Sequence, residues 1–176
     1  MFDIELCIDD IKLCSVEKED MVIIKEWMQE EMNASDSELW TDISGLDDRF
    51  LEYYMSENEF FLKVVKQDEF VGILKGRVEF RNPNDVFIGC FILDSKLRGE
   101  GIGSKIILET IKYFEKNFGI YNFYTSIVDG SKEAIKFWTK NSFVLHRISK
   151  NYFNVQGKEK DMLIFKRLEK ANVNNC

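Results

Sequence analysis

Three glycines, Gly99, Gly101 and Gly103, stand at alternate positions in the run LRGEGIGSKI. Arg98 precedes them, and an apolar-periodic segment follows. Because glycine lacks a Cβ atom, its backbone can approach a ligand closely and turn N–H groups toward it. The start of a following helix adds unpaired N–H donors and a partial positive charge. The run therefore predicts a site for a phosphate or pyrophosphate, to which Arg98 can add a charge-assisted contact.

Two familiar phosphate-binding motifs do not fit this run. A dinucleotide-binding fingerprint requires a further glycine at position 104, where Ser104 stands. A P-loop requires Gly-Lys followed by Ser or Thr, and the run does not contain that sequence. The remaining alternative to a phosphate site is that the glycines form only a flexible turn without a ligand.

Composition limits the class of function. The chain has 176 residues, 45% of them apolar, and a formal net charge of −7. This length and apolar share suit one domain with a sizeable core. The acidic balance argues against a broad surface for DNA or RNA, and it suits a cationic small substrate as well as simple solubility. No apolar run approaches the roughly 20 residues of a membrane span.

The cysteines and the single histidine indicate the compartment and exclude some chemistry. Cys7, Cys14, Cys90 and Cys176 lie far apart without a CxxC pair, and the chain shows no signal peptide. A reduced, cytoplasmic setting is therefore expected. His146 has no cluster of potential ligands near it in the sequence, so no metal site is expected.

Hydrophobic periodicity predicts the elements that must position the glycine run. Alternation of apolar and polar residues indicates strands, and spacings of three and four indicate helices. The predicted strands cover residues 11–16, 59–66, 70–80, 85–93, 122–128, 143–153 and 160–168, and helices are predicted to begin near residues 17, 46, 103 and 131. The last two strands are expected to pair antiparallel. This order predicts a single α/β (α+β) domain around one sheet.

The glycine run and a second segment resemble two motifs of the GNAT N-acetyltransferase superfamily. The pattern Arg-x-x-Gly-x-Gly after an apolar strand is similar to the acyl-CoA-binding motif of that family. Residues 131–143, SKEAIKFWTKNSF, are similar to its motif Asn-x-x-Ala-x-x-Leu/Phe-Tyr-x-x-x-Gly-Phe. The resemblance implies one GNAT domain over residues 1–176, with its core at about 11–168. It also implies a mixed, mostly antiparallel sheet flanked by helices, in which the fourth and fifth strands splay apart.

The resemblance implies transfer of an acetyl group from acetyl-CoA to an amine of a small molecule or peptide by direct attack, without a metal. Direct attack needs no protein nucleophile, so Cys90 receives no chemical role. Main-chain groups at the end of the fourth strand would pair with the pantetheine arm like an added strand. The expected cofactor-binding residues are Ile92, Leu93, Arg98, Gly99, Glu100, Gly101, Ile102, Gly103, Ser104, Ser131 and Trp138.

Two residues of the second motif depart from the family pattern. Ser131 stands where the family has Asn, and it is also well placed to cap the helix that follows. Trp138 stands where the family has a Tyr that is often proposed to protonate the leaving thiolate, and an indole N–H is not a useful acid. We expect Trp138 to pack, with a wall for the pantetheine arm as the second interpretation. A thiolate needs little help from an acid, and Tyr124, Tyr152 or solvent can supply the proton.

The attacking amine must be neutral, so a general base or a water chain is useful. In histone-acetylating members of the family a carboxylate opens the fourth strand, so the resemblance points to Asp85 as the candidate base, and Glu79, which ends the previous strand, is the competing candidate. The alternative for both is a turn residue or a solvated charge without a role in catalysis. Acceptor sites of the family use the first two helices, the loop between them and the last strand pair. Here that loop carries Asp36, Glu38, Trp40 and Asp42. Carboxylates beside an aromatic ring can hold a cationic amine, such as a protein N-terminus, a polyamine, an aminoglycoside or an amino acid.

A second class of function remains open at the level of sequence. The departures at Ser131 and Trp138 are compatible with an acyl-CoA-binding sensor or interaction module that has little or no turnover. The expected partners are acetyl-CoA and an amine acceptor, a cationic one among the candidates, with neither nucleic acid nor a membrane. A monomer and a homodimer both fit the sequence.

Overall fold

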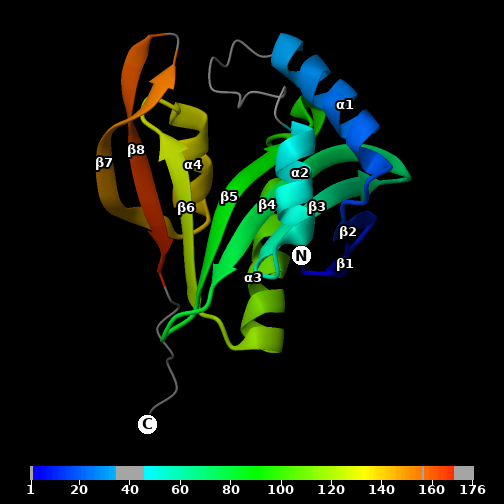
Figure 1. Ribbon diagram of the computed structural model, residues 1–176, viewed down its shortest axis with the longest axis horizontal. Helices are drawn as coiled ribbons and strands as arrows, with labels where there is room; N and C mark the ends of the chain where they lie inside the picture. Colours follow the sequence, from blue (N-terminus) through cyan, green and yellow to red (C-terminus); the bar gives the residue numbers. More distant parts are fainter. Residues whose placement is uncertain (1, 35–45, 156, 169–176) are drawn as a thin grey trace.

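An eight-stranded sheet with helices on both faces organises the computed structural model, which describes residues 2–34, 46–155 and 157–168 (Figure 1). The strands are β1 Glu5–Ile8, β2 Ile11–Ser15, β3 Glu59–Lys66, β4 Glu69–Glu79, β5 Asp85–Leu93, β6 Asn122–Val128, β7 Phe143–Val155 and β8 Lys158–Arg167. The helices are α1 Asp20–Ala34, α2 Leu46–Met55, α3 Ile102–Phe118 and α4 Lys132–Lys140, with a 3₁₀ turn, η1, at Ser95–Leu97.

Every strand and helix that periodicity predicts is present, and β7 pairs antiparallel with β8 as expected. Periodicity does not predict β1, because its four residues, ELCI, are too few to distinguish a strand from a loop. Pairing with β2 defines it, from Glu5 opposite Cys14 to Ile8 opposite Ile11. The extra strand shifts the numbering by one, so the predicted fourth and fifth strands are β5 and β6.

The strand order is β1-β2-β3-β4-β5-β6-β8-β7, and β5 with β6 is the one parallel pair in the described sheet. The mixed, mostly antiparallel sheet is therefore confirmed. The parallel ladder ends where Ile88 lies opposite Thr125, although β5 continues to Leu93 and β6 to Val128. Figure 1 shows the two strands parting beyond that point.

A β-bulge and a buried hydroxyl mark the place where β5 leaves β6. Gly76 of β4 lies opposite Ile88 while the residue before it lies opposite Cys90, so Gly89 is the extra residue of the bulge. The hydroxyl of Thr125, which is 2% exposed, donates a hydrogen bond to the carbonyl oxygen of Ile88 at 2.9 Å. A bulge bends a strand and increases its twist. β5 therefore turns away beyond Ile88, while Thr125 holds the last paired position.

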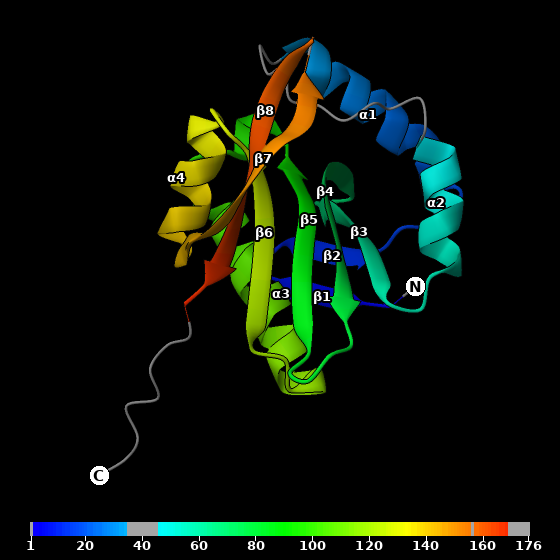
Figure 2. The ribbon, with the colours of Figure 1, turned by 60° about the vertical axis from the view of Figure 1, so that its left-hand side comes forward.

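Two hydrophobic clusters attach the helices to opposite faces of the sheet (Figure 2). The larger cluster holds α3 and α4 and includes Ile107, Ile111, Phe114 and Trp138. The smaller cluster holds α1 and α2 and includes Met21, Ile24, Met28 and Phe50. The glycine run follows β5 and η1 and leads into α3, so it connects the sheet to the helix that the larger cluster holds.

We expect Gly76→Ala to lower the free energy of unfolding by about 3 kcal/mol, the upper end of the usual overpacking cost. An added Cβ atom would lie 2.4 Å from the ring of Phe60 and 2.5 Å from the carbonyl oxygen of Phe87. Urea unfolding measures the loss. Gly89→Ala is the matched control, because a Cβ atom there meets nothing closer than 4.0 Å. Equal losses in the two variants would contradict this packing of the bulge.

Candidate active site

The glycine run forms an open loop between η1 and α3. Gly99 has a φ of +88° and Gly101 a φ of +84°, both in the left-handed region that favours glycine. A Cβ atom at either position would have nothing within 4 Å. The loop backbone is therefore accessible to a ligand, and side chains of the described residues do not cover it at these two positions.

The N-terminus of α3 continues this accessible backbone. Gly101 is the N-cap residue and supplies no side-chain hydrogen bond to the helix. The N–H groups of Ile102, Gly103 and Ser104 thus belong to the first turn, where a helix has no internal acceptors. Glu100 is exposed between the two glycines of positive φ. Backbone donors and the helix dipole together suit the phosphate groups that the sequence predicts here.

Gly103 has a packing role that differs from that of the other two glycines. A Cβ atom at Gly103 would lie 3.1 Å from the ring of Phe137 and 3.3 Å from the ring of Phe91. These two rings, from α4 and β5, lie 5.7 Å apart between centroids. The missing side chain lets the first turn of α3 lie against both rings, which fixes the helix N-terminus beside the end of β5.

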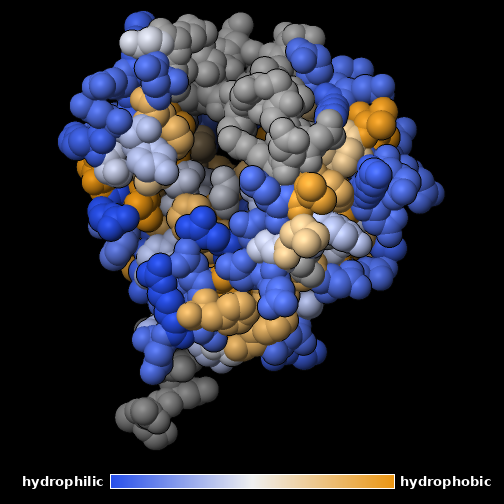
Figure 3. Space-filling view, viewed as in Figure 1, coloured by the Kyte–Doolittle hydropathy of each residue, from blue (hydrophilic) through white to orange (hydrophobic). Residues whose placement is uncertain are grey.

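Beyond the parallel ladder, one edge of β5 has no neighbouring strand among the described residues. Ile92 and Leu93, the residues expected to meet the pantetheine arm, belong to this stretch and lead toward the glycine run. An unpaired strand edge can accept an extended ligand through main-chain hydrogen bonds. In Figure 3 the surface is recessed between the part that carries β5 and the part that carries β6, β7 and β8.

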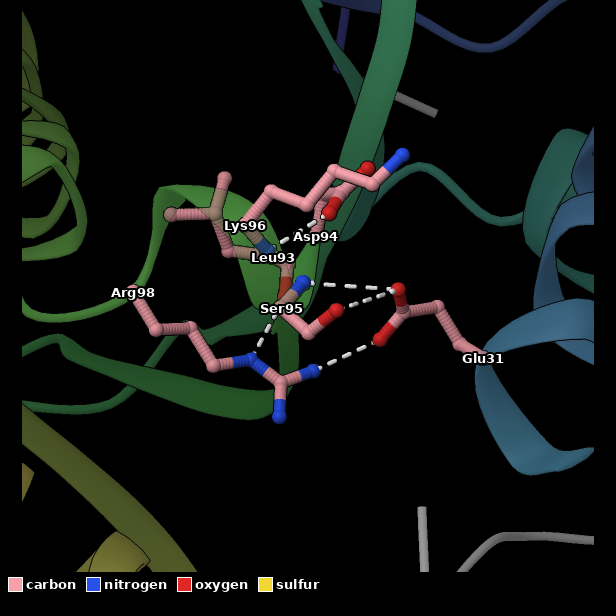
Figure 4. A network of polar contacts seen from close by, with 6 residues as sticks. All are labelled: Glu31, Leu93, Asp94, Ser95, Lys96 and Arg98. Atoms are coloured by element: carbon pink, nitrogen blue, oxygen red, sulfur yellow. Dashed lines mark hydrogen bonds and ion pairs between the residues drawn. The ribbon is translucent and has the colours of Figure 1, made fainter. Parts of the chain in front are cut away.

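Arg98 makes its contacts within the protein (Figure 4). Its Nε donates to the carbonyl oxygen of Leu93 at 2.9 Å, and its terminal nitrogen donates to Oε2 of Glu31 on α1 at 2.8 Å. The Arg98 side chain is 49% exposed. The predicted phosphate contact therefore competes with a carboxylate that the guanidinium already pairs with.

Glu31 was not predicted as a site residue from the sequence, although α1 carries a signal for it. The buried side chains of α1 recur at helical spacing as Met21, Ile24 and Met28, and Glu31 occupies the next position of that stripe. The whole residue is 7% exposed. A carboxylate at an apolar position must find hydrogen-bond partners to be buried, so such an interruption predicts a specific contact.

The second motif contributes packing. Trp138 is 6% exposed, and its ring meets those of Phe137 and Phe143 at centroid distances of 5.2 and 4.9 Å. This environment supports the packing interpretation of Trp138. Ser131 occupies the N-cap position of α4, as expected, but its hydroxyl makes no capping hydrogen bond.

The two candidate bases lie at the opposite end of β5 from the glycine run. Glu79 faces Asp85 across the β4–β5 ladder. Asp85 lies three residues, about 10 Å, before the splay, the point after Ile88 and Thr125 where β5 and β6 part. The Glu79 carboxylate is paired with Arg77 at 2.8 Å and with Arg81. Within the described ranges, Asp85 makes no ion pair. The structure thus brings neither carboxylate to the glycine run, and Asp85 is the freer of the two.

The two candidate proton donors, Tyr124 and Tyr152, and the thiol of Cys90 differ in position and burial. Tyr124 lies on β6 in the last part of the parallel ladder, with its ring 5.7 Å from that of His146 and 5.5 Å from Nζ of Lys166. Tyr152 is 60% exposed on β7. Burial raises the pKa of the Cys90 thiol, so this group stays neutral and is a poor nucleophile.

Several sequence-based expectations concern parts or features beyond this site. Asp36, Glu38, Trp40 and Asp42, the expected acceptor residues, lie outside the described residues. In the described ranges, no group of three or more His, Cys, Asp or Glu side chains could hold a metal ion. The helices of these ranges are also too short or too polar to cross a membrane.

The chain is similar to known acetyltransferases. The family model "Acetyltransferase (GNAT) domain" matches residues 13–164, whereas no curated protein matches the sequence. An acetyltransferase from Salmonella typhimurium that modifies the N-terminal serine of ribosomal protein L7/L12 has a TM-score of 0.79 at 14% identity, over 93% of this chain and 97% of that chain. The ribosomal-protein-S5-alanine acetyltransferase from Vibrio fischeri has a TM-score of 0.72 at 17% identity, over 96% and 98%. Spermidine N-acetyltransferase from Vibrio cholerae, in complex with CoA and spermine, has a TM-score of 0.71 at 13% identity, over 90% and 95%.

We expect Gly101→Ala to weaken binding of coenzyme A about 10-fold, as measured by calorimetry, because a side chain at this positive φ costs about 1–2 kcal/mol and stands where a ligand approaches. Gly119→Ala is the control. Gly119 has a φ of +62° at the other end of α3, and a Cβ atom there also has nothing within 4 Å. Both variants should lose stability, but Gly119→Ala should bind coenzyme A normally. Equal affinities of the two variants would show that the glycine run does not bind the donor.

Proposed function

Because the chain belongs to the GNAT family of acetyltransferases, we propose that it transfers the acetyl group of acetyl-CoA to a primary amine of a small molecule or peptide. The observation that carries this proposal is the free edge of β5, which leads from the splay through η1 to the glycine run. The run and the first turn of α3 supply donors for the phosphates, and the β5 edge supplies main-chain partners for the pantetheine arm.

The proposed reaction is direct attack of the amine on the acetyl group, with Asp85 as the acceptor of the amine's proton. In direct attack the amine nitrogen bonds to the acetyl carbon as the carbon–sulfur bond breaks, which leaves an amide and the thiolate of coenzyme A. The nitrogen must lose a proton, and Asp85 can accept it through water, since about 10 Å of strand separates it from the splay. Cys90 forms no acyl intermediate in this scheme, because burial keeps its thiol neutral.

Tyr124 is the better placed of the two phenols to return a proton to the thiolate. Its neighbours on β6, Phe123 and Thr125, are buried, and Phe123 packs in the α3–α4 cluster. Since successive side chains of a strand point to opposite faces, Tyr124 faces the α1–α2 side of the sheet at the splay. Trp138 lies within the α3–α4 cluster and contributes packing.

The acceptor is expected to enter from the α1–α2 side. The similar enzymes named above act on the N-terminal serine of a ribosomal protein, on a ribosomal-protein alanine and on spermidine. All of these acceptors are amines. The carboxylates of Asp36, Glu38 and Asp42, with Trp40, support a cationic acceptor through their charge.

Thiol release from acetyl-CoA against a panel of amines tests the proposed function. We expect turnover with at least one of four classes: peptides that begin with Ser or Ala, polyamines, aminoglycosides and amino acids. Cationic acceptors should have the higher kcat/KM, because acidic side chains stand on the expected acceptor loop. Binding of coenzyme A without turnover on the whole panel would favour a sensor or interaction module. Absence of coenzyme A binding at millimolar concentration would contradict the proposal itself.

Substitutions at Trp138 test whether the family's usual acid is needed. We expect Trp138→Phe to keep most of kcat, because the side chain packs inside the α3–α4 cluster, and to cost about 1–3 kcal/mol of stability. Trp138→Tyr should not raise kcat. An increase of the 10²–10⁴-fold typical of general acid–base catalysis would show that a needed acid is missing. Tyr124→Phe is the companion variant, and it should lower kcat while Trp138→Phe does not.

A further inference from the structure

Glu31 is the one buried charged side chain among the described residues. Its Oε1 accepts hydrogen bonds from the backbone nitrogen of Ser95 at 3.3 Å and from the Ser95 hydroxyl at 3.4 Å, and its Oε2 accepts from Arg98 at 2.8 Å. Figure 4 shows that all these donors come from the short segment between β5 and the glycine run. Among the described residues, this carboxylate of α1 thus finds its hydrogen-bond partners only in this segment.

The same segment receives further support from Arg98 and Asp94. The second bond of Arg98, from Nε to the carbonyl oxygen of Leu93, ties the guanidinium to the last residue of β5. The Asp94 carboxylate accepts from the backbone nitrogen of Lys96 at 2.8 Å. Arg98 therefore connects the end of β5 with α1 immediately before the glycines begin. Its planar fork is suited to hold two acceptors at fixed angles.

The loop itself has few other means of holding its shape. Nothing lies within 4 Å of the Cβ positions of Gly99 and Gly101, so side-chain packing does not support them. Downstream, Gly103 is fixed between Phe91 and Phe137. Upstream, the contacts of Arg98 are the last side-chain contacts before the glycines. The η1 turn and the packing of Leu97 hold the segment against the sheet, and the Glu31–Arg98 pair is the contact that ties the start of the loop to α1.

We propose that Glu31 is a positioning residue for the glycine run. Through Arg98 and Ser95 it fixes the start of the run, and it couples binding of the acyl-CoA donor to the position of α1. The proposal rests on the proposed function and deepens it. Arg98 serves the donor through its pairing with Glu31, and not chiefly as a ligand of the phosphates. Because α1 belongs to the acceptor side, the pair links the donor and acceptor sites.

Calorimetry with coenzyme A tests the proposal on Glu31→Gln, Arg98→Ala and the double variant. Glu31→Gln keeps the shape of the side chain and removes its charge, and we expect it to weaken binding about 5-fold or more, the lower end of typical coupling between sites. Arg98→Ala should give a similar loss. The double variant should bind no more weakly than Arg98→Ala, because both changes remove one shared interaction.

Arg98→Lys distinguishes positioning from direct phosphate binding. Lysine keeps the charge but cannot donate to Leu93 and Glu31 with the geometry of a guanidinium, so we expect a loss close to that of Arg98→Ala. If Arg98 instead binds the phosphates of coenzyme A directly, the opposite pattern is expected. Glu31→Gln would then leave the affinity unchanged or raise it by releasing the guanidinium, and Arg98→Lys would keep most of the binding. That pattern would overturn the proposal.

Two control variants match the charges that are removed. Glu30→Gln removes an exposed carboxylate from the neighbouring position of α1, and Lys96→Ala removes an exposed cation from η1. Both should bind coenzyme A as the wild type does. A lower melting temperature of ligand-free Glu31→Gln with unchanged coenzyme A affinity would reduce the pair to a structural contact and would overturn the proposal.

Steady-state kinetics test the proposed link between Glu31 and the acceptor site. At saturating acetyl-CoA, Glu31→Gln should also raise the acceptor KM, whereas Glu30→Gln should not; an unchanged acceptor KM would overturn the proposed link through α1. The failure of the proposed function is distinguishable from these outcomes. If the wild type binds coenzyme A but acetylates no amine, the proposed function fails, and the calorimetric comparison still decides whether Glu31 positions the loop.

Discussion

The early end of the parallel ladder between β5 and β6 is the constraint on which the site depends. The two strands are parallel because α3 connects them, and they stay paired only as far as Ile88 and Thr125. The bulge at Gly89 turns β5 away from its neighbour, and the Thr125 hydroxyl holds the last position. A strand that loses its partner inside a sheet keeps unsatisfied main-chain groups, and these groups are what an extended ligand can use.

An open, glycine-rich loop must be held from its two ends. Bare backbone at Gly99 and Gly101 gives a ligand access, but it also removes the packing that would hold the loop in place. Downstream, the first turn of α3 lies against the rings of Phe91 and Phe137. Upstream, Arg98 joins the end of β5 to Glu31 on α1. Apolar packing at one end, and at the other an ion pair between half-exposed Arg98 and buried Glu31, thus fix a segment that makes few contacts itself.

The substitution of the family's Tyr by Trp138 is explained by packing. An indole with 6% exposure between Phe137 and Phe143 stabilises the attachment of α4, and its N–H has no acidity that catalysis could use. The proposed reaction does not require the Tyr, because a thiolate is a good leaving group near neutral pH. The proton can come from Tyr124, which faces the other side of the sheet, or from solvent.

The sequence by itself determined the local features. Periodicity predicted every described strand and α-helix except β1, and the glycine run predicted an open loop before a helix, because backbone freedom and hydrophobic alternation are properties of neighbouring residues. The tertiary structure decided what depends on distant pairing. β1 exists through its ladder with β2, Glu31 meets Arg98 across 67 positions of the chain, and Asp85 lies far from the glycines because strand direction sets it at the other end of β5. Such contacts follow from strand register and helix placement, which no short stretch of sequence specifies.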